Sequence, residues 1–170
     1  MDATKNFALT AKAISIELSE INGPPAEGIL AGTQSVIAVS LVRNTRGYIE
    51  KIANQINGTY ENGWFDGCSV LIRRLLETLI IECFEAHRIS AKIKNSNGDF
   101  FHLRDLISQT ISEPSWNLGR NCKGALPKLK DVGDKSAHSR RFVAHRSDIE
   151  KLLPEIRLVI QELLYLAQLK

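Results

Sequence analysis

The stretch with the most reactive side chains for its length is Val132–Arg141, which reads Val-Gly-Asp-Lys-Ser-Ala-His-Ser-Arg-Arg. His138 follows Asp134 by four residues, so the two side chains would lie one turn apart in a helix. An acidic neighbour orients an imidazole and favours its charged form. A histidine among cations can act as acid or base in phosphodiester cleavage, and RNA supplies its own 2′-hydroxyl as nucleophile. A structural role, in which His138 hydrogen-bonds neighbouring helices, fits the same residue types.

The region around this stretch is locally basic, although the net charge of the whole chain is only +3. A local cationic surface would favour phosphate or RNA. A solvated surface with no ligand would have the same composition. The cations of the region are Lys123, Lys128, Lys130, Lys135, Arg140, Arg141 and Arg146, against Asp131 and Asp134.

The sequence gives little support to a metal site, a nucleotide-binding loop or a nucleophile elbow. His138, His145 and Cys122 have no recognised metal-ligand spacing, and no glycine-rich nucleotide loop or nucleophile elbow is present. We therefore expect neither a metal nor a cofactor. Trp64 and Trp116 are expected to anchor helix ends, with base stacking as the alternative, above all for Trp116.

The most apolar segment, about residues 61–87, is predicted to be a central helix because apolar residues occupy nearly every face. Arg73, Arg74 and Glu77 stand out on it. Arg73 and Glu77 are four apart and can pair on one face. The charges form either a structural ion pair or the wall of a site shared with the 132–141 stretch.

The rest of the chain also predicts helices. Residues 2–21 have an amphipathic stripe, and a second helix is expected from about 28–33 to 57, where the alternative for Val36–Val42 is a strand. Further helices are expected after an N-cap at Asp99, over about 117–130, and after a capping box at Ser147–Glu150. The 132–141 stretch is expected to be a polar break between the last two.

These elements predict one all-α domain, a bundle of about five to six helices over residues 1–170. Hydrophobic residues make up 44% and charged residues 24%, as in ordinary globular proteins. The number of cysteines is odd, with Cys68, Cys83 and Cys122. Cys68 and Cys83 are predicted to be buried free thiols, which fits a reducing cytosol. No segment reads as a signal peptide or a membrane span, so we expect a cytoplasmic location and no membrane partner.

Two segments resemble a bacterial family of the HEPN superfamily (higher eukaryotes and prokaryotes nucleotide-binding). Tyr60–Cys68, running into Leu71–Glu77, is similar to its characteristic helix. Leu129–His138 is similar to its second signature, basic–x–x–Gly–Asn/Asp–x–x–Ala–His. The resemblance covers about residues 60–166 and leaves 1–57 as N-terminal helices outside it.

The resemblance implies a helical bundle that commonly forms homodimers. Many superfamily members are metal-independent ribonucleases of toxin–antitoxin or phage-defence systems, which would imply RNA and a cognate antitoxin or defence protein as partners. Other members have lost catalysis and serve as binding or assembly modules. Two readings follow: a domain that binds or cleaves RNA, or a non-enzymatic interaction and dimerisation module with a structural polar network.

The family's catalytic motif is an arginine, four to six residues, then a histidine, and this chain departs from it. Asp131, Val132 and Gly133 occupy the arginine positions ahead of His138. Arg140 and His145 have the formal spacing but lie past the matching segment. For a nuclease, we expect His138 as acid or base, Asp134 to orient it, and Arg73 and Arg74 to contact phosphate.

Overall fold

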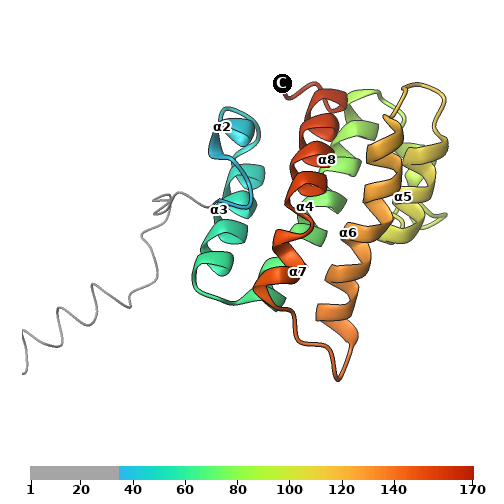
Figure 1. The fold of residues 1–170 in the computed structure, drawn as a ribbon. Coiled ribbons are helices and arrows are strands. Elements are labelled where there is room, and N and C mark those ends of the chain that lie inside the picture. The colour runs from blue at the N-terminus through green and yellow to red at the C-terminus, as the bar shows by residue number, and fades with distance from the viewer. Residues whose placement is uncertain (1–34) are drawn as a thin grey trace, which may run out of the picture. The chain divides into compact units, whose positions relative to one another are not determined.

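The prediction of an all-α fold is confirmed by a computed structural model, which describes residues 35–170 (Figure 1). These residues lie within one compact unit, Gly32–Lys170, and contain seven α-helices, one short 3-10 helix and no strand. The helix predicted at residues 2–21 lies outside the described residues. The elements are α2 (Val39–Val42), α3 (Gly47–Glu61), α4 (Phe65–Ala86), η1 (Ser90–Ile93), α5 (Leu103–Ser112), α6 (Arg120–His138), α7 (Arg146–Glu150) and α8 (Leu153–Leu166).

Helix α4 is the central helix, as its sequence predicts. It contacts α3, α5, α6, α7, α8 and η1 (Figure 1). Its 22 residues include a long buried series, and burial of such aliphatic side chains is the main force that holds a bundle together. The fully buried thiols of Cys68 and Cys83 belong to it, and burial raises the pKa of both to about 12.

The predicted continuous helix from about 28–33 to 57 is wrong over residues 35–46, the described part that precedes α3. Its residues 35–38 are non-helical, α2 is one turn long, and α3 begins only at Gly47. Asn44 has a φ of 63°, a left-handed conformation that asparagine tolerates and that interrupts a helix. The Glu50 carboxylate accepts a hydrogen bond from the Asn44 N–H at 2.7 Å and stabilises the interruption.

Asn57 holds the segment before α2 against α3. Its side-chain oxygen accepts a hydrogen bond from the Ile37 N–H at 2.9 Å, and its amide donates to the Ile37 carbonyl at 2.8 Å. Both residues are buried, so this side chain replaces the backbone pairing that the segment lacks.

The Asn57→Ala variant should therefore lose about 2–4 kcal/mol of stability, because two buried backbone groups of Ile37 lose their partner. We expect the Tm to fall by roughly 5–15 °C in a thermal melt. Asn62→Ala is the matched control, since the Asn62 side chain is exposed and its only hydrogen bond within residues 35–170 goes to the Gly58 carbonyl one turn earlier. Equal melting temperatures for the two variants would contradict this role of Asn57.

The predicted polar break at 132–141 is largely helical, which corrects both this break and the predicted end of the 117–130 helix. Helix α6 continues through Gly133 to His138, and the connection to α7 is only residues 139–145. Pro127 lies inside α6 on its exposed side. The glycine that suggested a break instead lies at a helix crossing.

Two further helix starts differ from the predicted ones. Asp99 does not cap a helix, since α5 begins at Leu103 after a turn in which the Asn95 side chain accepts from the Asp99 N–H. The predicted cap at Ser147 is also wrong. The cap lies at His145, whose N–H donates to Asp148 at 2.9 Å. Pro154 lies in the first turn of α8, a position where the missing N–H of proline costs no hydrogen bond within the helix.

Candidate functional site

Gly133 lets α6 approach α4 at close range. A Cβ at this position would lie 2.6 Å from the Arg73 Cβ and 3.0 Å from the Ser69 carbonyl oxygen. Any side chain would therefore push the two backbones apart. The crossing places the next residue, Asp134, directly beside Arg73.

Asp134 joins two cations from two helices. The Arg73 Nε donates to Asp134 Oδ1 at 2.7 Å, and the Lys130 Nζ donates to Oδ2 at 2.6 Å. Burial alone would raise the pKa of Asp134, but the hydrogen bonds from Lys130 and Arg73 outweigh it and hold the pKa below its ordinary value. The predicted Arg73–Glu77 pair is also present, with Nη1 and Oε2 3.9 Å apart.

Asp134→Asn tests this network. A carboxylate with a lowered folded-state pKa stabilises the protein above its unfolded pKa, and that contribution is lost as the pH falls through the folded value. At neutral pH we expect a loss of about 1 kcal/mol, since the side chains of Arg73 and Asp134 are 27% and 31% exposed. The difference from wild type should shrink below pH 3.8, the ordinary value for this carboxyl.

The measurement is urea unfolding of wild type and Asp134→Asn across the acid range. Asp131→Asn is the matched control, because Asp131 is more exposed and lies 3.5 Å from the same Lys130. The control should change stability by less than about 0.5 kcal/mol. A difference for Asp134→Asn that persists unchanged at pH 2 would contradict an electrostatic origin.

His138 lies in the last turn of α6 and is exposed. The expected hydrogen bond from Asp134 is not formed, because the Asp134 oxygens accept from Arg73 and Lys130. Among the described residues, His138 has no side-chain hydrogen bond or ion-pair partner. The structure thus leaves its imidazole open to solvent and any ligand.

The two arginines expected to contact phosphate differ in their surroundings. Arg73 faces α6 and is paired with Asp134. Arg74 is about 100° further round the helix, is exposed, and has no acidic partner within residues 35–170. Of the two, Arg74 is the cation available to a ligand without breaking an ion pair.

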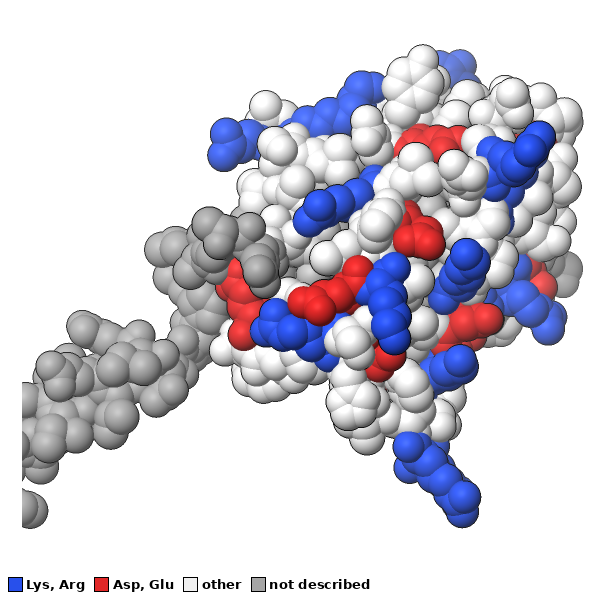
Figure 2. All heavy atoms as spheres, in the orientation of Figure 1, with Lys and Arg blue, Asp and Glu red and all other residues white. Residues whose placement is uncertain are grey.

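The connection from α6 to α7 adds cations next to His138. Arg140 and Arg141 are exposed, as is Lys135 one turn before His138, and none of the three has an acidic partner in the described part of the chain. Figure 2 shows Asp and Glu interspersed with Lys and Arg over this face, and basic side chains projecting where Figure 1 places the α6–α7 connection. We call His138, Lys135, Arg140 and Arg141 the α6 tip.

The connection is held to the start of α4. The Ser139 Oγ accepts from the Phe142 N–H at 3.2 Å, and the Asp66 carboxylate accepts from the Ala144 N–H at 3.0 Å. The α6 tip and the first turn of α4 therefore lie at the same end of the bundle (Figure 1).

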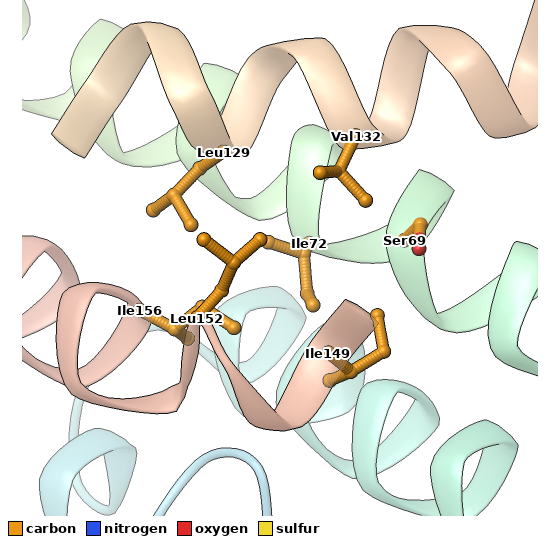
Figure 3. Close-up of a pocket in the computed structure, with 7 residues that line it drawn as sticks. All are labelled: Ser69, Ile72, Leu129, Val132, Ile149, Leu152 and Ile156. Atoms are coloured by element: carbon orange, nitrogen blue, oxygen red, sulfur yellow. The ribbon is translucent and has the colours of Figure 1, made fainter. Parts of the chain in front are cut away.

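A cavity of about 10 Å³ between α4, α6, α7 and α8 holds at most about one water molecule. Its walls are almost entirely apolar (Figure 3), so it is a packing defect and not a substrate site. The lining residues are Ser69, Ile72, Leu129, Val132, Ile149, Leu152 and Ile156.

The two tryptophans differ in their contacts and exposure. Trp116 is anchored as predicted, since its Nε1 donates to the Thr110 carbonyl at 3.0 Å and its ring packs edge-on against Phe84 and His87. Trp64 is 63% exposed, so its predicted anchoring is wrong. Nothing in the sequence around Trp64 indicates this exposure, which only the fold reveals.

Comparison of the chain with models of known families, with curated proteins and with solved structures finds no match. Across residues 35–170, no helix is both long enough and apolar enough to pass through a bilayer.

Proposed function

We propose that this chain is a HEPN-like domain that binds RNA at the α6 tip and cleaves it with His138 as acid or base. The observation that carries the proposal is the exposure of His138 in the last turn of α6, beside three cations that have no acidic partner within residues 35–170. The similarity of Leu129–His138 to the family signature supports it. A His138 buried among structural partners would have argued against it.

The chemistry requires no group beyond the chain and its substrate. His138 takes the proton of an RNA 2′-hydroxyl, whose oxygen then attacks the adjacent phosphorus. The bond from phosphorus to the 5′-oxygen breaks, and this oxygen takes the proton that His138 accepted, which leaves a 2′,3′-cyclic phosphate, a 5′-hydroxyl and a neutral His138. Cations at the tip stabilise the charge that develops on the phosphate. Arg74 and the α6 tip take over the phosphate contact expected of Arg73.

A homodimer would bring two such tips together, and a bacterial defence or toxin–antitoxin setting with a cognate antitoxin or defence protein is the context we propose. A cytoplasmic location accords with three reduced, buried cysteines.

The second candidate function is a non-enzymatic interaction module. It is favoured by one observation, the Arg73–Asp134–Lys130 network, because Asp134 stabilises a helix crossing and does not orient His138. In that case the residues of the second signature serve packing alone.

The two candidates separate in an RNA-binding titration with a labelled oligonucleotide. Reversing Lys135, Arg140 and Arg141 to Glu should weaken binding by about 10-fold to 100-fold at low salt, because about three phosphate contacts are lost. The control reverses Arg43, Arg88 and Arg120, which are exposed cations at the opposite end of the bundle, with the same change in charge. Equal weakening by both triples, or no binding by wild type, would overturn the proposal.

A further inference from the structure

Trp64 stands out among the aromatic residues near the α6 tip. It directly precedes α4 and its backbone is fixed, since its N–H donates to the Thr59 carbonyl at 2.8 Å. Its side chain is 63% exposed and has no ring or cation contact within residues 35–170. A large rigid ring held by ordered backbone but left in solvent presents a flat apolar face to a ligand.

The aromatic residues near Trp64 in the sequence, Tyr60 and Phe65, do make ring and cation contacts. Tyr60 and Phe65 pack edge to face with ring centres 5.8 Å apart. The Arg146 guanidinium lies 4.9 Å from the centre of the Tyr60 ring and 5.7 Å from that of Phe65. Glu150 accepts a hydrogen bond from the Tyr60 hydroxyl. Tyr60 is thus buried and Phe65 half-buried beside Arg146, whereas Trp64 next to them is exposed.

Trp64 shares its end of the bundle with the α6 tip. The bond from the Ala144 N–H to Asp66, two residues after Trp64, ties the α6–α7 connection to the start of α4. Val143 beside it is 62% exposed. The end of α6 and the start of α4 lie at one end of the bundle (Figure 1). This end thus combines exposed arginines, an exposed histidine and an exposed tryptophan.

We infer that Trp64 is a base-stacking contact and that the RNA bound at this end is single-stranded. Cations track a phosphate backbone while an aromatic face stacks on a base, which is how proteins hold single strands without reading sequence. A duplex covers its base faces and offers none to Trp64. The inference rests on the proposed function and adds a residue and a substrate class to it.

The test compares a labelled single-stranded RNA with its duplex. For the single strand, Trp64→Ala should weaken binding by about tenfold and Trp64→Phe by less, because phenylalanine keeps a ring. Duplex binding should be weaker and insensitive to either change. Tyr165→Ala is the matched control, since Tyr165 is 73% exposed near the end of α8, at the other end of the bundle, and it should leave binding unchanged.

Intrinsic fluorescence gives an independent readout, because the chain has two tryptophans and Trp116 is packed. The single strand should quench wild-type emission, and the quenching should disappear in Trp64→Phe. If the charge-reversal triple weakens binding while Trp64→Ala and the quenching do not respond, this inference fails and the proposed function stands. A change of oligomeric state in Trp64→Ala would also overturn it, by making Trp64 a protein contact. No RNA binding by wild type would overturn both.

Discussion

Gly133→Ala should destabilise the protein by about 2 kcal/mol and lower its Tm by roughly 4–8 °C. The new methyl group would lie 2.6 Å from the Arg73 Cβ and 3.0 Å from the Ser69 carbonyl oxygen. Neither atom is the free end of a flexible side chain, so α4 and α6 must separate. Alanine is the better helix former by about 1 kcal/mol, and the expected loss is what remains after that gain.

Gly124→Ala is the matched control in the same helix. No atom lies within 4 Å of a Cβ at Gly124, so only the gain in helix propensity acts. This variant should be more stable than wild type by roughly 0.5–1 kcal/mol. Opposite signs for the two variants in thermal and urea unfolding would support the crossing. A Gly133→Ala variant as stable as Gly124→Ala would show that α4 and α6 are not in backbone contact there.

The central position of α4 could be predicted from sequence because the information is local. Its apolar residues cover nearly every face, and the Arg73–Glu77 pair follows from the helical repeat alone. The Lys130–Asp134 pair has the same spacing and could have been predicted if residues 131–138 had been assigned to a helix.

The extent of α6 could not be predicted from local preference. Gly124, Pro127 and Gly133 all disfavour a helix in isolation. Packing against α4 overrides them, and at Gly133 the missing side chain is what the contact requires. The pairing of Arg73 with Asp134 depends on that crossing, so it too needed the tertiary structure.

In the candidate site, too, some features could be predicted from the sequence and others could not. His138 was identified from its residue type and neighbours, and the structure leaves it exposed. Its expected orienting partner, Asp134, points instead into the ion network. The exposure of Trp64, next to the packed rings of Tyr60 and Phe65, could not be predicted from the spacing of residues in the sequence.

His138→Ala should lower RNA cleavage by about 10²-fold to 10⁴-fold, the range that a positioned acid or base contributes. The fold should be little affected, because the side chain is exposed and has no bonding partner among the described residues. Its Tm should stay within about 2 °C of wild type. Loss of activity without loss of stability separates a catalytic role from a structural one.

The most direct measurement is a cleavage time course with purified protein and RNA in EDTA, comparing wild type, His138→Ala and His102→Ala. His102 is an exposed histidine just before α5 and serves as the control. Wild type and His102→Ala should cleave RNA without metal and leave 2′,3′-cyclic phosphate ends, whereas His138→Ala should cleave almost none. Wild type without activity, or equal cleavage by all three proteins, would contradict the proposed function.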